Sequence, residues 1–296
     1  MSQITDKIRK QFKESDDIRD AGLITPDDIV RYDDIVYGED PTSQSLDVYR
    51  PKAAVGKVLP VIVSVHGGGW VYGDKERYQY YCMNLAQRGF AVVNFTYRLA
   101  PEFKYPSSLE DTNSVFTWVL DNALQYGFDV KHVFAVGDSA GAHNLGLYCG
   151  ICTNADYAAE YDFKPPTGFS PTAIALNCGV YRITLAEGER DETQTLIQEF
   201  LPQRGSPKEI ELINVLNHVT GNYPPTFLMT CTGDFVKEQA PILAAKLAQC
   251  DVPFVYRYYG DTDHVLGHVF HCNMRSADAK LCNDEECNFF KEFLQN

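Results

Sequence analysis

The sequence lacks a long hydrophobic run and is short of positive charge. No stretch approaches the roughly twenty apolar residues that a membrane-spanning helix needs, and residues 1–31 are polar and charged rather than a basic tip followed by an apolar segment. We therefore expect neither a membrane span nor a signal peptide. The 296 residues hold 26 Lys and Arg against 40 Asp and Glu, a formal net charge of −14. This balance argues against nucleic acid or an anionic membrane as a partner.

Cysteines are present but follow no disulfide or metal-binding pattern. Their number, nine, is odd, and they are scattered through predicted strands and helices, which is typical of free thiols in a reducing compartment. We therefore expect a cytoplasmic protein. Cys272, Cys282 and Cys287 lie near His268 and His271 in the sequence, but their spacing matches no compact zinc motif, so we predict no metal site.

Strand-like and helix-like segments alternate through most of the chain, without internal repeats or low-complexity tracts. This alternation predicts the α/β class, with a largely parallel sheet joined by crossover helices. The length of 296 residues suits a single α/β domain with insertions. The predicted strands are Ser45–Tyr49, Leu59–Val65, Ala91–Tyr97, Val133–Val136, Ala173–Asn177, Thr226–Thr230 and Phe254–Tyr259. The predicted helices are Tyr78–Arg88, Leu109–Asn122, Ala140–Thr153, Lys237–Gln249 and Asp278–Leu294.

Two regions stand outside this alternation, and we predict that they form a cap. One is about residues 1–40, where apolar positions are sparse, and the other is residues 179–225, between two predicted strands. The second region contains two predicted short helices, Thr193–Leu201 and Pro207–His218. Helical segments that follow the carboxyl ends of strands cover the crevice where α/β proteins bind ligands. The alternative is a peripheral elaboration that does not contact the substrate.

Two glycine-rich motifs each follow an apolar, strand-like segment. The first, H-G-G-G-W at residues 66–70, offers backbone N–H groups of the kind that an oxyanion hole requires. The second, G-D-S-A-G at residues 137–141, is a G-x-S-x-G motif. In this motif a serine occupies a strained strand-to-helix turn, and the flanking glycines leave room for that turn. Together, and in this order, the two motifs predict a serine esterase.

A serine nucleophile needs an acid and a base, and in α/β-hydrolases the chain order is serine, acid, histidine. The search for both partners therefore runs from Ser139 toward the C-terminus. Asp234 comes shortly after the predicted strand Thr226–Thr230, and we choose it as the acid. Asp261 and Asp263 also follow a predicted strand, but they belong to the loop that should carry the histidine.

The loop at residues 260–271 offers three histidines as the base. His264 lies nearer to the preceding strand, whereas His268 follows a glycine and is predicted to open the final helix, in which we expect His271 to lie. These residues leave His264 and His268 nearly even, because the base has only to reach Ser139 while its other nitrogen donates to the acid. The histidines beside or within other predicted elements are expected to be structural: His132, His143 and His218.

The oxyanion of the tetrahedral intermediate needs two or three N–H donors. We expect them from Ala140, the residue after the nucleophile, and from Gly68 and Gly69. Removal of one such donor typically costs about 3 kcal/mol. His66 is expected to hold the glycine loop by hydrogen bonds rather than to transfer protons.

The chain carries two further segments with family character, Y-R-L-A-P-E at residues 97–102 and the segment at residues 37–51. With the two glycine motifs, they make the chain resemble the hormone-sensitive-lipase-like family of α/β-hydrolases over nearly its whole length. The resemblance implies an α/β-hydrolase fold with a mostly parallel eight-stranded sheet flanked by helices and a helical cap. It also implies carboxylic ester hydrolysis without a cofactor, by a monomer or homodimer.

The resemblance also bears on the choice of histidine. The family's catalytic histidine usually stands in a His-x-Phe segment, which here is residues 268–270 and favours His268. The usual spacing between acid and histidine falls nearer His264, so the choice of His268 implies a longer loop. The acid segment departs from the family's Asp-Pro-Leu, since Phe235 and Val236 follow Asp234.

Compact members of the family resemble carboxylesterases of short acyl chains, and we expect the same preference here. Trp70, Tyr72 and Asp138 are expected to bind the substrate. The 18 tyrosines make acylated sugars and esters of aromatic acids further possibilities. Two alternatives to an esterase stay open: an amidase or peptidase on the same fold, and a binding protein that has lost turnover.

Overall fold

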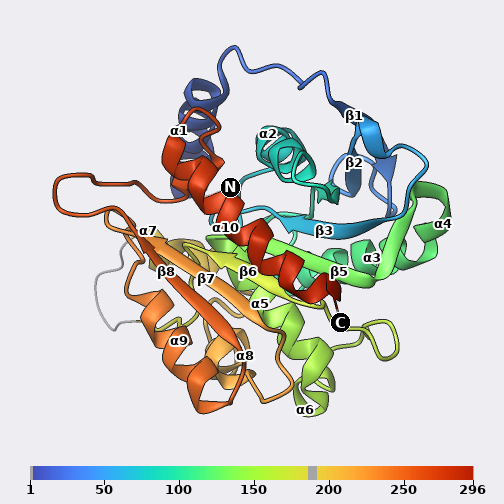
Figure 1. Cartoon of the computed structure of the whole chain (residues 1–296). Helices are drawn as coiled ribbons and strands as arrows, with labels where there is room; N and C mark the ends of the chain where they lie inside the picture. Colours follow the sequence, from blue (N-terminus) through green and yellow to red (C-terminus); the bar gives the residue numbers. More distant parts are fainter. Residues whose placement is uncertain (1–2, 186–191, 296) are drawn as a thin grey trace.

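The computed structural model describes residues 3–185 and 192–295 (Figure 1). Residues 1–2 and 186–191, which belong to the two predicted cap segments, lie outside the described residues. Eight strands form one sheet in the order β1-β2-β4-β3-β5-β6-β7-β8. β2 pairs antiparallel with β1 and with β4, and every other neighbouring pair is parallel. The strands are β1 (Ile29–Val36), β2 (Ser45–Pro51), β3 (Leu59–Val65), β4 (Ala91–Phe95), β5 (Phe128–Asp138), β6 (Ile174–Asn177), β7 (Thr226–Cys231) and β8 (Phe254–Tyr259).

Helices lie on both faces of the sheet, so the predicted fold class is confirmed. Side chains of α2 and α10 pack on one face, and those of α3, α5 and α9 pack on the other. The α-helices are α1 (Gln3–Asp20), α2 (Lys75–Ala86), α3 (Ser107–Asp121), α4 (Ala123–Tyr126), α5 (Ala140–Thr153), α6 (Ala155–Ala158), α7 (Glu192–Phe200), α8 (Pro207–Ile213), α9 (Gln239–Gln249) and α10 (Ala277–Lys291). Within the described ranges, no helix is both long enough and apolar enough to cross a membrane.

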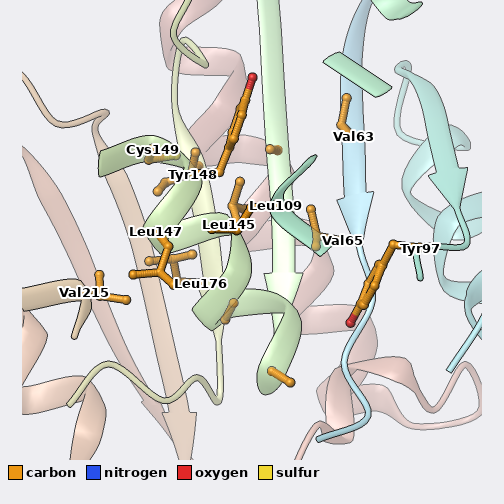
Figure 2. Packing of buried hydrophobic residues seen from close by; sticks show 14 of the residues in the cluster. Val63, Val65, Tyr97, Leu109, Leu145, Leu147, Tyr148, Cys149, Leu176 and Val215 are labelled. Atoms are coloured by element: carbon orange, nitrogen blue, oxygen red, sulfur yellow. The ribbon is translucent and has the colours of Figure 1, made fainter. Parts of the chain in front are cut away.

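The central strands are apolar on both sides because helices cover both faces of the sheet. In β3, Val63 and Val65 belong to one buried cluster, whereas Ile62 belongs to the cluster on the opposite face. Leu145 and Leu147 of α5 pack into the same cluster as the two valines (Figure 2). Burial of one such side chain stabilises the fold by about 1.5–3 kcal/mol. This packing fixes the strand ends from which the functional loops leave.

The prediction of a cap over residues 1–40 is wrong for its last part. Ile29–Val36 is strand β1, which pairs with β2 at the edge of the sheet, with an irregularity between Tyr32 and Ile35. Three of its eight residues are charged, and Tyr32 and Val36 are exposed. The alternation of apolar and polar residues that would indicate a strand is therefore weak, as is common at a sheet edge. Of the described N-terminal residues, those of helix α1 line a cavity at the carboxyl ends of the parallel strands.

The final helix begins later than its histidines would suggest. The final helix, α10, begins after Ser276, whose side chain accepts backbone N–H groups of the first turn. Ser206 caps the start of α8 in a similar way, together with Glu209. His268 therefore lies in a loop, and His271 lies in a short 3₁₀ turn, Phe270–Cys272. The prediction that His268 opens the last helix and that His271 lies within it is wrong.

Helix α10 carries one carboxylate into the interior. Glu286 is fully buried, and its two oxygens accept hydrogen bonds from the hydroxyl of Tyr81 at 2.9 Å and from the amide of Asn177 at 2.7 Å. Burial raises the pKa of Glu286 to about 7, although the Asn177 and Tyr81 donors lower it in part. Because an unfolded glutamate has an ordinary pKa near 4.3, the folded protein binds this proton first as the pH falls.

Replacement of Glu286 by Gln should therefore change how stability depends on pH. As the pH falls from about 8 to about 5, proton uptake by Glu286 should raise the free energy of unfolding of the wild type, and the Glu286→Gln variant should lack this gain. Urea unfolding at pH 8, 7, 6 and 5 measures the difference, with Glu285→Gln on the same helix as the control. Parallel pH profiles for the wild type and Glu286→Gln would contradict the expectation.

Candidate active site

The loops that carry the predicted chemistry all leave the carboxyl ends of strands. The glycine run follows β3, Ser139 follows β5, Asp234 follows β7, and His268 follows β8. Carboxyl ends of parallel strands meet at one edge of the sheet, where α/β folds bind ligands. Residues that are far apart in the sequence therefore reach one place.

Ser139 stands at a sharp turn between β5 and α5. Its backbone has φ 50° and ψ −119°, a conformation that is strained for a residue with a side chain. Its N–H donates to the carbonyl of Asn177 at 2.9 Å. Gly141 is required by close approach, since a Cβ there would lie 2.1 Å from the carbonyl oxygen of Val65. The turn lifts the serine hydroxyl out of the sheet toward the cavity.

The structure brings Ser139, His268 and Asp234 together. The Nε2 of His268 lies 3.0 Å from the Oγ of Ser139, and its Nδ1 lies 2.6 Å from the Oδ1 of Asp234. Asp234 also accepts the hydroxyl of Thr230 at 2.7 Å and the N–H of Val236 at 3.0 Å. Burial alone would raise the pKa of Asp234, but the His268 contact and these two donors hold it below its ordinary value. The ionised carboxylate places the imidazole proton on Nδ1 and leaves Nε2 free to accept.

The other two histidines of this loop lie elsewhere. The side chain of His264 is 59% exposed, and its Nε2 contacts the carboxylate of Asp278 at 3.0 Å. His271 is fully buried against the ring of Tyr81, and burial lowers its pKa to about 3. Asp261, which the sequence also offered as an acid, accepts the N–H of His264 and so shapes the turn. The geometry favours His268 as the base.

The loop of His268 is tied to the loop of the acid. The N–H of Gly233 donates to the carbonyl of Leu266 at 2.8 Å, and Gly233 forms an isolated parallel bridge with Gly267. The thiol of Cys231 donates to the carbonyl of Gly267 at 3.2 Å. Val269, directly after the histidine, has φ 51°, which is unusual for a β-branched residue. These contacts fix the imidazole between serine and acid.

The three predicted oxyanion donors, Gly68, Gly69 and Ala140, lie at the cavity beside Ser139. Gly68 has φ 119°, and a Cβ there would lie 2.0 Å from the carbonyl oxygen of Tyr72, so only glycine fits. In the hydrogen bonds that join described residues, the N–H groups of Gly68, Gly69 and Ala140 have no acceptor. All three residues line the same cavity as Ser139. They are available to a developing negative charge.

His66, at the start of the glycine loop, holds the loop through its imidazole ring. The Nδ1 of His66 lies 2.7 Å from the carbonyl of Gly67, and its ring stacks on Tyr97 with centroids 4.0 Å apart. Burial lowers the pKa of His66 to about 4, so the ring stays neutral at physiological pH. This is the loop-holding contact expected for His66.

Asp138, which is predicted to bind the substrate, also holds the glycine loop. It borders the cavity, but it is only 3% exposed, and its oxygens accept the N–H of Gly67 at 3.1 Å and the hydroxyl of Tyr78 at 2.8 Å. Burial raises the pKa of Asp138 to about 6, although the Tyr78 hydroxyl lowers it in part. The carboxylate positions the glycine loop beside the nucleophile.

Trp70 links the glycine loop to the insertion between β6 and β7. Its Nε1–H donates to the Nδ1 of His143 at 3.1 Å, and the Nε2 of His143 lies 2.8 Å from the carbonyl of Ile213 in α8. The Trp70 ring also stacks on Phe200 of α7, with centroids 5.3 Å apart. Tyr72, the other predicted substrate contact, donates its hydroxyl to Asp16 of α1 at 2.9 Å.

A cavity of about 500 Å³ opens over Ser139. Its lining combines the motif residues with side chains from both predicted cap segments, so the two segments do contact this cavity where they are described. Phe235 borders it from the acid loop, with its ring 4.4 Å from that of His268. From helix α1 come Ile8, Gln11, Phe12, Ser15, Asp16 and Arg19, and from α7 come Glu192, Thr193 and Leu196.

Sequence reasoning missed several residues of this site. Tyr78, Thr230 and His143 were not assigned to it, because each acts through a hydrogen bond to a functional residue rather than through a motif. For Thr230, the position four residues before the acid on the same strand end was the available signal. Residues 1–40 were predicted to form part of a cap, but no signal in the sequence shows which side chains of α1 line the cavity.

Comparisons with known proteins agree with this geometry. The BD-FAE family model matches residues 46–247, more than half of the chain. The chain is 27% identical to the versiconal hemiacetal acetate esterase of Dothistroma septosporum over 232 residues, which cover 73% of this chain and 69% of that protein. It is 29% identical to esterase LipC of Mycobacterium tuberculosis over 68% of this chain, and it spans about half the length of that relative.

Solved structures show the same likeness over nearly the full length. Esterase B from Lactobacillus rhamnosis superposes with a TM-score of 0.88 at 26% identity, covering 98% of this chain and 95% of that one. A second structure of esterase B, inhibited by a C4-C4 tributyrin phosphonate, also superposes with a TM-score of 0.88, at 25% identity, covering 99% and 96%.

Proposed function

The chain belongs to the BD-FAE family, among the hormone-sensitive-lipase-like carboxylic ester hydrolases, and from this premise we propose that it cleaves esters of short acyl chains through an acyl-enzyme on Ser139. One observation carries the proposal: His268 bridges the hydroxyl of Ser139 and the carboxylate of Asp234 at 3.0 and 2.6 Å. This is the arrangement that activates a serine for acyl transfer.

In the acylation step, the Oγ of Ser139 attacks the ester carbonyl while the Nε2 of His268 takes the hydroxyl proton. The imidazolium that forms is stabilised by Asp234. The carbonyl oxygen becomes an oxyanion, which the free N–H groups of Gly68, Gly69 and Ala140 stabilise. His268 then returns its proton to the departing alcohol, and the acyl group stays on Ser139.

In the deacylation step, His268 serves again as the base. A water molecule enters from the cavity and loses its proton to Nε2 as it attacks the acyl carbon. The same three N–H groups stabilise the second oxyanion, and collapse of the intermediate releases the acid and restores Ser139. The contact of 3.0 Å between Ser139 and His268 supports the first proton transfer, and the proposed steps use no cofactor or metal.

The cavity supports a preference for short acyl chains. Trp70 and Leu196 border it close to the oxyanion donors, and a Cβ on Gly69 would lie 3.2 Å from Leu196, so α7 packs closely over the glycine loop. A relative named for an acetate ester and a similar structure inhibited by a tributyrin phosphonate point the same way. The physiological ester we propose is a small molecule, for which acylated sugars and esters of aromatic acids are candidates. The protein acts as a monomer or homodimer in the cytoplasm under this proposal.

A chain-length series tests this proposal. We expect kcat/KM for p-nitrophenyl acetate and butyrate to exceed that for the octanoate by about tenfold or more. Each methylene that does not fit the pocket raises the activation free energy of the longer ester by about 1–3 kcal/mol relative to the shorter one. The matching anilides, measured beside them, should be cleaved far more slowly. Faster hydrolysis of octanoate, or activation at an oil–water interface, would contradict the chain-length preference. Equal turnover of the anilides would favour an amidase.

A further inference from the structure

Soft donor atoms gather directly behind the His268–Asp234 pair. The Sγ of Cys178, just after β6, lies 3.8 Å from the Sδ of Met229 in β7. Cys231 lies at the end of the same strand, β7, and its thiol donates to the carbonyl of Gly267. One donor atom from each of Cys178, Asp234 and His268 lies within 4.8 Å of the others. Sulfur, nitrogen and oxygen ligands of three chain segments therefore meet at one point.

We propose that this cluster is an inhibitory binding site for a thiophilic divalent cation such as Zn²⁺. Thiolate, imidazole and carboxylate are the ligands by which proteins hold Zn²⁺. The sulfur atoms select it over Mg²⁺ and Ca²⁺, which prefer oxygen ligands. Cys178, His268 and Asp234 supply three ligands, which leaves the fourth tetrahedral position open.

The distances are close to those of a bound ion. Tetrahedral Zn²⁺ holds nitrogen and oxygen at about 2.0–2.2 Å and sulfur at about 2.3 Å, so its ligand atoms are about 3.3–3.8 Å apart. The donor atoms within 4.8 Å of one another need to approach by about 1.5 Å at most, through side-chain rotation. The 2.6 Å contact between His268 and Asp234 lengthens in exchange.

The cluster lies behind one wall of the substrate cavity. His268 and Val269 line that cavity, and so does Val180, two residues after Cys178. Cys178 and Asp234 are 1% and 3% exposed, whereas the side chain of His268 is 20% exposed. A rotation of the imidazole therefore gives a cation from the cavity its route to the sulfur.

Binding would remove the base from the reaction. The cation takes the place of the proton on the Nδ1 of His268, which moves to Nε2 so that the imidazole stays neutral, and it displaces the thiol proton of Cys178, which passes to solvent. No bond is oxidised or reduced. His268 loses its carboxylate partner and its alignment with Ser139, so hydrolysis stops until a chelator removes the ion.

The first test measures ester hydrolysis in thiol-free buffer with increasing ZnCl₂ or MgCl₂, followed by EDTA. The wild type should be inhibited by Zn²⁺ but not by Mg²⁺, and EDTA should restore its rate. In Cys178→Ser, scaled to its own metal-free rate, the half-inhibitory Zn²⁺ concentration should rise at least about tenfold, since even an outer partner of a metal ligand is worth that much affinity. Cys149→Ser, an equally buried thiol in α5, should behave as the wild type. Cys178→Ala provides a second variant should the serine not fold.

The second test needs no turnover, so its outcome is separate from that of the proposed esterase function. Co²⁺ added to Ser139→Ala should give the near-ultraviolet absorption of a cobalt–thiolate bond, and the double variant with Cys178→Ser should lose it. Inhibition of the wild type and Cys178→Ser at the same Zn²⁺ concentration would overturn the proposal. So would an absence of inhibition in the wild type, or a cobalt spectrum that does not change without Cys178.

Discussion

Ser139→Ala should abolish ester hydrolysis and leave the fold intact. Loss of the nucleophile in a serine–histidine–acid enzyme lowers kcat by about six orders of magnitude, so the remaining rate should be indistinguishable from background. The fold should survive because the hydroxyl points into the cavity and its one partner is the Nε2 of His268. The measurement is turnover of p-nitrophenyl butyrate together with the thermal unfolding midpoint.

Two companion variants make this result specific. Ser114→Ala removes a hydroxyl that bonds only to the Glu110 carbonyl within α3, so its activity should match the wild type. Ser139→Gly should be as inactive as Ser139→Ala but more resistant to unfolding, because glycine adopts φ 50° without strain. Comparable turnover by Ser139→Ala, or stoichiometric fluorophosphonate labelling at another serine, would refute the assignment of the nucleophile.

His268→Ala should lower kcat by about four orders of magnitude or more, as removal of a triad base does elsewhere. His264→Ala should have a mild effect, because that side chain is 59% exposed and contacts Asp278 rather than Ser139. KM should change little in His268→Ala, since Nε2 acts on the hydroxyl of Ser139 and the proposal gives it no part in holding the substrate. Steady-state kinetics on the two variants and the wild type measure both quantities.

The reverse ranking of the two histidine variants would move the base to His264. His264 would then have to leave Asp278 and reach Ser139 in solution, and the His-x-Phe argument for His268 would be wrong. The esterase proposal and Asp234 as the acid would survive that result.

The sequence predicts those parts of the molecule that rest on local chemistry. The strand Leu59–Val65 begins and ends where its residues indicate, because a buried central strand carries a continuous apolar run. Phe254–Tyr259, at the edge of the sheet, also has its predicted bounds, since aromatic and β-branched residues favour strands. The serine turn could also be predicted from the sequence, because only glycine fits at Gly137 and Gly141, where a Cβ would collide with the backbone. The geometry that joins Ser139, Asp234 and His268 agrees with choices made from chain order and motif.

The parts that depend on long-range packing could not be predicted from the sequence. β1 is an edge strand with charged side chains, so its pattern resembles a polar cap segment. Asp138 stands in a motif beside the nucleophile, yet its direction is set by Tyr78 and Gly67 on other elements. The sequence alone does not show that Cys178 lies beside Asp234. Nearly fifty residues separate β6 from β7 in the chain, and only the pairing of these two strands in the sheet brings Cys178 and Asp234 together.

The central claim is that acyl groups pass through Ser139, and one measurement tests it most directly. The protein is mixed with p-nitrophenyl butyrate, quenched in acid within milliseconds, digested and analysed by mass spectrometry. The account predicts one butyryl group on the peptide that contains Ser139, formed in step with a burst of p-nitrophenol and absent from Ser139→Ala. A burst with the acyl group on another residue, or the same adduct in Ser139→Ala, would contradict it.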